Sequence, residues 1–195
     1  MKHHFRQFLR AKRDSLTQAE VIEKSKTITD ALIRSDLFEK SSSLFAYLDV
    51  RNEVHTRPLI EYCFGINKPV FVPVTRDREM FFTQLHGFSD LVEAGFGISE
   101  PAHPIAAEPD EKSLFIIPGV GFDECGNRIG YGAGFYDKYL HCRNLHRSNC
   151  RSGMHLVGIC FEIQMADELP KEETDVQMDS VLTENKWRIV GKECR

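Results

Sequence analysis

Glycine is concentrated in one stretch of this chain, where six of its 13 glycines fall between Gly119 and Gly134. Glycine loses the most backbone freedom on folding and adopts positive φ easily, so such a cluster indicates tight turns or a backbone close to a ligand. The apolar residues 114–117 predict a short buried strand before the cluster, and residues 135–142 predict a helix after it. A strand, a glycine loop and a helix N-terminus together can cradle a phosphate, because unpaired N–H groups and the helix dipole favour an anion there.

The spacing of the last three glycines in the cluster excludes the two common nucleotide-binding motifs. The run Gly130-Tyr131-Gly132-Ala133-Gly134 lacks the third glycine of the dinucleotide fingerprint, and no Gly-Lys-Ser/Thr follows it. A structural turn that packs a helix close to a sheet explains such a loop equally well. Asp137, early in the predicted helix, favours the phosphate site, because a carboxylate beside phosphates is repulsive unless a cation such as Mg²⁺ lies between them.

The length and composition of the chain limit its class. At 195 residues, of which 42% are hydrophobic, residues 1–195 can form one domain with a full core. A formal net charge of −4 and a pI near 6.1 argue against a nucleic-acid binder or a membrane-surface binder. The basic N-terminus is followed by no apolar signal region, and no apolar run approaches the roughly 20 residues needed to span a bilayer. We therefore expect a soluble, cytoplasmic protein in which local cations would hold any polyanionic ligand.

The six cysteines are scattered and include no Cys-x-x-Cys pair, so we expect all of them to be free thiols. Cys142, His146 and Cys150 are spaced by four, as soft metal ligands on one helical face would be. The surrounding Asn, Ser and Gly residues instead favour a polar surface loop, because zinc sites usually show tighter ligand pairs. No metal is predicted at these three residues.

Apolar strands that alternate with helices predict an α/β fold with three layers: a mostly parallel central sheet and helices on both faces. Helices are expected at 2–13, from a Thr17–Glu20 capping box to about residue 34, from Thr56 to 64, and at 135–142. Strands are expected at 44–48, 70–74, 80–85, 114–117 and 156–161, with an edge strand at 181–183, and the Pro-rich residues 100–111 are expected to be a surface loop. Ligands collect at the carboxyl ends of parallel strands, so the glycine loop and residues 49–53 should share one rim of the sheet.

Residues 119–140 resemble the signature of the 5-formyltetrahydrofolate cyclo-ligases, also called 5,10-methenyltetrahydrofolate synthetases. Four other segments are similar to family segments and occur in the same order, so the resemblance covers essentially the whole chain. They are Lys2 with Arg6, then Tyr47 with residues 53–56, then residues 97–101, and finally the stretch from Leu169 to Glu184.

The resemblance implies a reaction that consumes ATP. A formamide oxygen is a poor leaving group, and its phosphorylation allows N10 of 5-formyltetrahydrofolate to close the ring to 5,10-methenyltetrahydrofolate, with release of ADP and phosphate. Such chemistry depends on positioning and on charge compensation more than on acid–base steps.

The resemblance also implies roles for individual residues. ATP would be bound by Lys2, Arg6, Arg128, Ile129, Gly130, Tyr131, Gly132, Ala133, Gly134, Phe135 and Tyr136, among which Arg128 and Tyr136 would act in catalysis. The folate would contact Leu48, Glu53 and the inner loop residues Tyr131, Gly132, Ala133, Gly134 and Phe135. Asp137 and Asp175 would bind Mg²⁺, and the protein would be a monomer with no nucleic-acid or membrane partner.

From the residues alone, each of these side chains also has a plainer interpretation. Lys2 and Arg6 form a basic pair at i and i+4 that is usually a solvated helix face. Asp137 is a favourable acid in a first helical turn, and Glu53 would cap the helix that begins near Thr56. Asp175 would be a surface turn residue, and Tyr47 a core residue.

Three positions depart from the family pattern. Ala133 stands where relatives have Gly, Lys or Arg, Phe135 replaces a common Tyr, and Thr174 replaces a common His. None of them removes a residue that the proposed chemistry requires. Two other classes of function stay open: a folate- or nucleotide-binding paralogue without turnover, and a sugar-phosphate isomerase or CoA transferase on a similar sheet.

Overall fold

A computed structural model describes residues 1–94, 98–143, 154–191 and 194. Within this part of the chain the centre is an eight-stranded sheet with the order β13-β12-β10-β7-β1-β2-β3-β6. Its parallel strands are β1 (Ser43–Ala46), β2 (Val70–Arg76), β7 (Ser113–Pro118), β10 (His155–Ile159) and β12 (Ser180–Leu182). Its antiparallel strands are β3 (Glu79–Gln84), β6 (Ala106–Ala107) and β13 (Trp187–Ile189).

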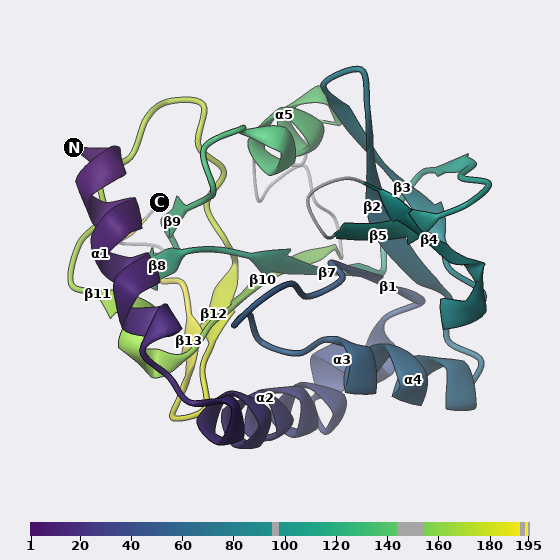
Figure 1. The fold of residues 1–195 in the computed structure, drawn as a ribbon, viewed down its shortest axis with the longest axis horizontal. Coiled ribbons are helices and arrows are strands. Elements are labelled where there is room, and N and C mark those ends of the chain that lie inside the picture. The colour runs from purple at the N-terminus through teal and green to yellow at the C-terminus, as the bar shows by residue number, and fades with distance from the viewer. Residues whose placement is uncertain (95–97, 144–153, 192–193, 195) are drawn as a thin grey trace.

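Helices cover both faces of the sheet, as expected (Figure 1). One face carries α2 (Gln18–Ile33), α3 (Asp36–Lys40) and α4 (Arg57–Gly65), and the other carries α5 (Phe135–Cys142). All residues of the central strands β1 and β7 are buried, which accounts for their continuous apolar sequence. The predicted three-layer α/β fold with a mostly parallel sheet is confirmed. Among the described residues, no helix is both long enough and apolar enough to cross a membrane.

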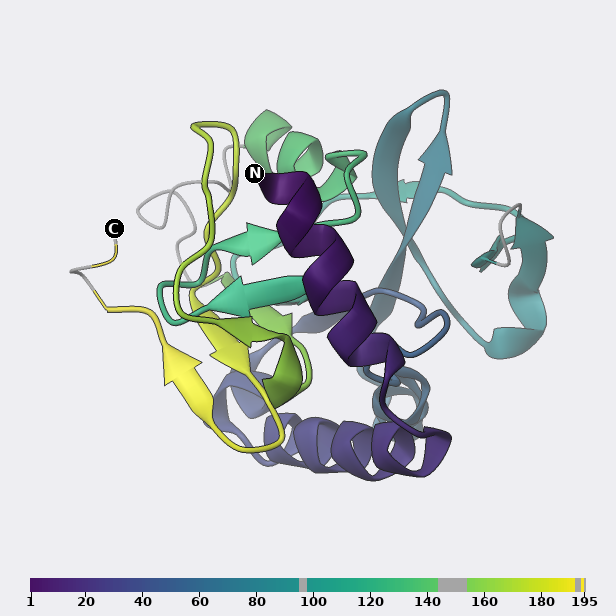
Figure 2. The ribbon, with the colours of Figure 1, turned by 60° about the vertical axis from the view of Figure 1, so that its left-hand side comes forward.

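A small second sheet stands beside the central one and supports the N-terminal helix α1 (Lys2–Asp14), as Figure 2 shows. It consists of β11 (Met165–Ala166), β8 (Gly121–Asp123) and β9 (Arg128–Ile129), in that order. The β8–β9 hairpin separates β7 from the glycine loop, so the expectation that the loop follows residue 117 directly is wrong. Strands of two or three residues are too short to show a period of two in the sequence.

Aromatic packing holds this hairpin against the central sheet. The Phe122 side chain of β8 is fully buried, and its ring lies where a Cβ at Gly119 or Gly158 would be. An added Cβ at Gly158 would lie 2.8 Å from Cδ1 and 2.9 Å from Cζ of Phe122. Glycine at these two positions therefore lets β8 approach β10 closely and fixes the start of the segment that leads into the glycine loop.

Several expected elements are confirmed with small changes in their ends. The capping box of α2 forms as predicted, since the Thr17 N–H donates to Glu20 Oε2 at 2.8 Å and Thr17 Oγ1 accepts from the Glu20 N–H at 3.3 Å. Helix α5 spans the predicted residues. Strand β1 ends two residues before the predicted 48, because Tyr47 leaves the sheet: its carbonyl accepts from Thr56 Oγ1 at 2.7 Å and its hydroxyl donates to the Val54 carbonyl at 2.9 Å.

Two expectations about the sheet edges are wrong. The strand near residues 181–183 is internal, because β13 pairs with it on the outside. Residues 100–111 are more than a loop, since they contain the end of the β4 (Leu91–Ala94) and β5 (Ile98–Pro101) hairpin and the short strand β6. The 3-10 turns η1 (Phe88–Asp90) and η3 (Glu162–Gln164) complete the described elements.

The expectation that all six cysteines are free is also wrong. Cys125 in the β8–β9 turn forms a disulfide with Cys194, 69 residues away. A pairing over that separation leaves no local spacing pattern that sequence analysis could detect. Cys63 and Cys160 are buried free thiols, and Cys142 is exposed at the end of α5. His146 and Cys150, considered above with Cys142 as metal ligands, lie outside the described residues.

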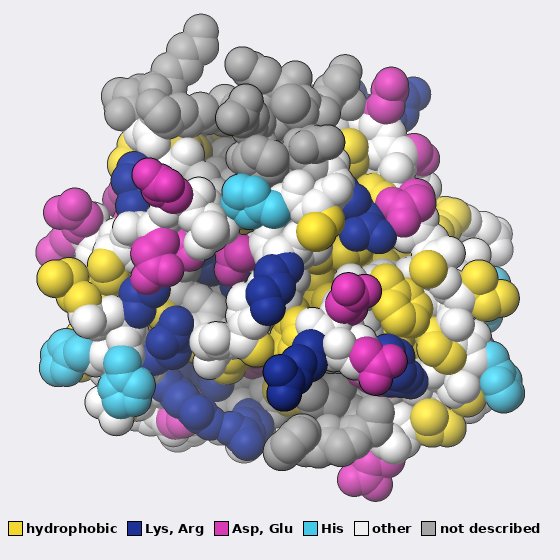
Figure 3. Space-filling view, turned by 90° about the horizontal axis from the view of Figure 1, so that it is seen from above, with side chains coloured by type: hydrophobic (Ala, Val, Ile, Leu, Met, Phe, Trp, Pro, Cys, Tyr) yellow, Lys and Arg dark blue, Asp and Glu magenta, His cyan; other side chains and the backbone are white. Residues whose placement is uncertain are grey.

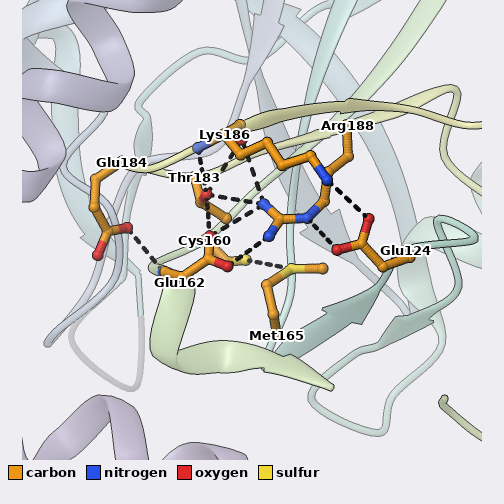
Figure 4. A network of polar contacts seen from close by, with 8 residues as sticks. All are labelled: Glu124, Cys160, Glu162, Met165, Thr183, Glu184, Lys186 and Arg188. Atoms are coloured by element: carbon orange, nitrogen blue, oxygen red, sulfur yellow. Dashed lines mark hydrogen bonds and ion pairs between the residues drawn. The ribbon is translucent and has the colours of Figure 1, made fainter. Parts of the chain in front are cut away.

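A cluster of charges around Arg188 ties the C-terminal hairpin to the small sheet (Figure 4). Its guanidinium lies between two acids: Nε donates to Glu124 Oε1 at 2.7 Å, and Nη1 donates to Glu162 Oε2 and to Thr183 Oγ1, both at 3.1 Å. These contacts join β13, the β8–β9 turn and η3. The hairpin that precedes the glycine loop is thus held at two places. Phe122 holds strand β8, and Arg188 and the disulfide hold the turn between β8 and β9.

Replacement of Gly158 tests the close packing of β8. We expect Gly158→Ala to lower the free energy of unfolding by about 1–3 kcal/mol, the usual cost of overpacking a rigid core. The second substitution Phe122→Leu should recover part of that loss. The loss of unfolding free energy in the double variant should therefore be smaller than the sum of the losses in the two single variants. Urea unfolding would measure both.

Gly65→Ala is the matched control, because an added Cβ there meets no atom within 4 Å. It should change the free energy of unfolding by no more than about 0.5 kcal/mol. Equal stability of the Gly158 and Gly65 variants would contradict the packing account.

Candidate active site

A cavity of about 760 Å³ lies at the carboxyl ends of β1 and β7. Its wall is built from α1, the loop after β1, strands β2 and β3, the end of β5, the glycine loop with the start of α5, and residues 172–175. All fifteen residues that the sequence analysis selected line it: Lys2, Arg6, Leu48, Glu53, Arg128, Ile129, Gly130, Tyr131, Gly132, Ala133, Gly134, Phe135, Tyr136, Asp137 and Asp175. Residues that are up to 173 positions apart in the chain thus face one space.

Two glycines give the loop its path into α5. Gly132 has φ +113° and Gly134, which caps α5, has φ +69°, and both values strain any residue with a side chain. The cap position leaves the first N–H groups of α5 without helical partners. The helix N-terminus therefore presents N–H donors and a positive dipole end beside the cavity, as a phosphate site requires.

Arg128 and Asp137 form the most buried ion pair of the glycine-loop segment. The Arg128 side chain is 5% exposed, and its Nη2 donates to Asp137 Oδ2 at 2.8 Å. Its Nη1 donates to the Pro118 carbonyl at 3.3 Å, while Asp137 Oδ1 accepts from the Val176 N–H at 3.1 Å. The pair therefore fixes the loop to the end of β7 and to the segment that contains Asp175.

Helix α1 brings two further cations to the cavity. Lys2 Nζ donates to Asp175 Oδ1 and Oδ2 at 2.8 and 2.6 Å, and lies 3.2 Å from Glu172 Oε1. Arg6 Nε donates to the Gly130 carbonyl at 2.7 Å. With only 17% of its side chain exposed, Lys2 is not part of an open solvated face, which removes the plainer interpretation of that residue. In Figure 3, basic and acidic side chains lie interspersed over the face of the molecule seen from above.

The acids Asp137 and Asp175 lie close to each other in the fold. Asp137 accepts from the backbone of the residue that follows Asp175, and both acids line the cavity. No group of three or more His, Cys, Asp or Glu residues is arranged to hold a metal in the described part of the chain. Two carboxylates nevertheless suit Mg²⁺, which prefers oxygen, keeps several waters and takes the remaining ligands from substrate phosphates. The residues present fit Mg²⁺ bound together with a phosphate, and do not fit a closed protein cage.

Glu53 is buried in the half of the cavity away from Asp175. Its Oε2 accepts from the Val50 N–H at 3.0 Å, and its Oε1 accepts from the Tyr131 hydroxyl. Burial raises the pKa of Glu53, although the hydrogen bonds from Tyr131 and Val50 and the charge of Arg13 lower it. The helix-cap role expected for Glu53 belongs to Asp49 instead, whose Oδ1 accepts from the Thr56 N–H at 2.8 Å and from Thr56 Oγ1 at 3.1 Å.

Three tyrosines of the site stay neutral because burial raises the pKa of each hydroxyl: Tyr47, Tyr131 and Tyr136. The Tyr136 hydroxyl is buried and makes no hydrogen bond to any residue that the structure describes. The same holds for Arg128 Nε. Buried donors without partners are costly, so these two atoms are suited to a ligand that brings acceptors.

A model of the 5-formyltetrahydrofolate cyclo-ligase family matches residues 1–184. The chain belongs to this family. Membership confirms the resemblance expected from the motifs and the prediction of an enzyme of this kind.

Relatives and a solved structure agree along almost the whole length. The 5-formyltetrahydrofolate cyclo-ligase of Escherichia coli is 27% identical over 91% of this chain and 97% of its own. That of Mus musculus is 25% identical, with 94% of both chains covered. The NMR structure of the Aquifex aeolicus 5,10-methenyltetrahydrofolate synthetase matches with a TM-score of 0.82 at 27% identity, and covers 97% of this chain and 92% of its own.

The departures from the cyclo-ligase pattern all lie at the cavity wall. Ala133, Phe135 and Thr174 line it beside the residues discussed above. Without a basic side chain at Ala133, the cations assigned to ATP are Lys2, Arg6 and Arg128, which all line the cavity. The structure gives no further reason for the other two departures.

Sequence analysis missed several residues that line the cavity. Arg13 lies on the same face of α1 as Arg6, seven residues or about two turns further along, so the helical period could have pointed to it. Glu100 lies in the cyclo-ligase segment 97–101, is 6% exposed, and accepts from the Thr75 N–H at 3.1 Å. Arg51, Thr75 and Met80 gave no local signal, because their place in the wall depends only on how the chain folds.

Replacement of Asp49 tests which acid caps α4. We expect Asp49→Ala to lower the free energy of unfolding by about 0.5–2 kcal/mol, because the backbone N–H groups of Thr56 and Arg57 lose their acceptor. Thermal unfolding followed by circular dichroism would measure the loss. An Asp49→Ala variant as stable as the wild type would contradict the assignment of this cap to Asp49.

Proposed function

We propose that this protein closes 5-formyltetrahydrofolate to 5,10-methenyltetrahydrofolate in a reaction that consumes ATP, requires Mg²⁺ and passes through a phosphorylated formyl oxygen. The family and the names of its relatives support the cyclo-ligase activity and ATP as its co-substrate. The single domain, the monomeric state and the cytoplasmic location stay predictions.

The observation that carries the proposal is the shared cavity. Cations and acids suited to ATP line one half, a buried carboxylate suited to the pterin lines the other, and residues 131–135 lie between them. Transfer of a phosphoryl group to the folate needs both substrates in one water-poor space with the reacting atoms in contact. A cavity of about 760 Å³ that includes both sets of residues supports this arrangement.

In the ATP half, the three cations assigned to ATP are each paired with a protein acceptor that ATP and Mg²⁺ would replace. Lys2 binds Asp175, Arg128 binds Asp137, and Arg6 binds the Gly130 carbonyl. We infer that phosphate oxygens take these three cations, which frees Asp137 and Asp175 for Mg²⁺. When bound, Mg²⁺ would neutralise charge on the phosphates. The unpartnered Tyr136 hydroxyl is a neutral donor that can face the transferring group.

In the folate half, Glu53 keeps free acceptor capacity for the ring. A carboxylate offers about four lone-pair sites, and two of them are used, by the Val50 N–H and by the Tyr131 hydroxyl. The remaining sites can accept the amide N–H and the amino group of a pterin. Leu48, which also lines the cavity, adds an apolar contact.

The formyl oxygen attacks the γ-phosphorus, the bond to the β-phosphate oxygen breaks, and ADP leaves. N10 of the folate attacks the formyl carbon, its proton is lost, and the C–O bond breaks with release of phosphate that carries the former formyl oxygen. In both steps the protein holds the reactants and compensates negative charge through Arg128, Lys2 and the N-terminus of α5.

A spectroscopic assay tests the proposal. The purified protein, 5-formyltetrahydrofolate, ATP and Mg²⁺ should give the near-UV absorbance of the methenyl product, and omission of ATP or Mg²⁺ should abolish it. ADP should form in a one-to-one ratio with the product. Folate binding without turnover would instead identify a binding paralogue, and the absence of folate binding would contradict the proposal and favour a sugar-phosphate or CoA substrate.

Asp137→Asn tests the proposed metal ligand. We expect kcat to fall at least about tenfold, the size of one lost transition-state contact, because Mg²⁺ binding weakens and phosphoryl charge stays uncompensated. The Kd of 5-formyltetrahydrofolate should stay unchanged. Glu108→Gln is the matched control, since that acid pairs with Arg143 and does not line the cavity. A wild-type rate of Asp137→Asn at limiting Mg²⁺ would remove Asp137 from the metal site.

A further inference from the structure

Arg13, in the last turn of α1, is a buried cation in the folate half of the cavity. Its side chain is 2% exposed, and burial of a guanidinium is costly unless other groups satisfy it. Its Nη1 donates to the Tyr131 hydroxyl at 2.6 Å and lies 3.8 Å from Glu53 Oε1. On its other side Nε lies 3.6 Å from Asp14 Oδ1. The guanidinium thus faces two residues proposed to bind the folate.

These contacts connect three segments that are far apart in the chain. Tyr131 comes from the glycine loop, Glu53 from the loop after β1, and Arg13 from α1. The Tyr131 hydroxyl accepts from Arg13 and donates to Glu53, so the three side chains form a continuous chain of hydrogen bonds. Buried polar chains of this kind favour one geometry of their members, because a displaced member leaves its hydrogen-bonding neighbour without a partner.

The charges around Glu53 make Arg13 important for its ionisation. The groups that face this carboxylate are Arg13 from α1, Tyr131 and Tyr136 from the loop and the start of α5, and Tyr47 and Asp49 from its own segment. Burial raises the pKa of Glu53, and Asp49 raises it further. Arg13 is the cation that opposes this shift.

We propose that Arg13 is a positioning residue for folate binding, which fixes the Tyr131 hydroxyl and the Glu53 carboxylate so that both face the incoming pterin ring. This role rests on the proposed function, because it concerns the carboxylate assigned to the pterin. Arg13 serves the folate half alone, in contrast to Lys2 and Arg6, which lie at the other end of the same helix and face the ATP half.

The test is the affinity for 5-formyltetrahydrofolate, measured by isothermal titration calorimetry with a non-hydrolysable ATP analogue and Mg²⁺ present. Arg13→Gln should raise the folate Kd about tenfold, because one charge-assisted contact is lost at the receiving carboxylate. The Kd of the ATP analogue, measured separately, should change less than about twofold.

The pH dependence separates this role from general stabilisation of α1. Without Arg13, the pKa of Glu53 rises further, so protonation removes the acceptor at a higher pH than in the wild type. As the pH falls, the folate Kd of Arg13→Gln should therefore begin to increase at a higher pH than the wild-type Kd does. Arg13→Lys keeps the charge and should restore most of the affinity and the wild-type pH profile.

A double-mutant cycle tests the connection to Glu53. In a Glu53→Gln background, Arg13→Gln should have little further effect on the folate Kd, because its target is already lost. Arg10→Gln is the control: Arg10 is on the same helix and lies 3.7 Å from Asp14, but its side chain is 44% exposed. Its folate Kd should equal that of the wild type.

The outcomes separate the two proposals. If the wild type binds no 5-formyltetrahydrofolate, the proposed function and this role fail together. If the wild type binds it and Arg13→Gln binds equally well, or loses folate and nucleotide affinity equally, the positioning role alone is overturned. A Lys variant no better than the Gln variant, or additive effects with Glu53→Gln, would also overturn it.

Discussion

The ion pair between Arg128 and Asp137 joins the parts of the chain that form the cavity. Arg128 reaches back to the Pro118 carbonyl at the end of β7, and Asp137 reaches across to the Val176 N–H. A buried ion pair is a weak source of net stability, but removal of one partner leaves an uncompensated charge and is strongly destabilising. The ion pair therefore fixes the path of the glycine loop between β9, which contains Arg128, and α5, which contains Asp137.

The ATP half of the cavity has to balance its charges both without and with a ligand. The protein as a whole is acidic, with a formal net charge of −4, yet its family implies ATP, a highly charged anion, as co-substrate. The cations proposed to bind ATP are held by acids and carbonyls, as the Lys2 contact with Asp175 illustrates. Under the proposed function, a phosphate and a divalent cation that enter together would each find a group of opposite charge, so no charge need stay buried without a partner.

Much of the cavity lining could be predicted from the sequence, because many of its residues belong to short local motifs. The glycine spacing indicated a loop that needs positive φ, and Gly132 and Gly134 have it. The helix that follows spans the predicted residues, and the resemblance selected fifteen residues that all line one cavity.

The rest depended on contacts between distant parts of the chain. The β8 and β9 strands are too short to show a period, and the Cys125–Cys194 disulfide spans 69 residues. Asp49 rather than Glu53 accepts from the first N–H groups of α4, because of a turn that residue propensities do not predict. Arg13 lies on a helix whose partner residues are known only once the chain has folded.

The central claim is that the cavity brings the formyl oxygen of the folate to the γ-phosphate of ATP, so that this oxygen leaves as part of phosphate. Its most direct test is the fate of ¹⁸O placed in the formyl group of 5-formyltetrahydrofolate. After turnover, mass spectrometry of the products should find the label in inorganic phosphate, one atom per methenyl product, and none in ADP or water. Label in water, or unlabelled phosphate formed together with the methenyl product, would contradict the account.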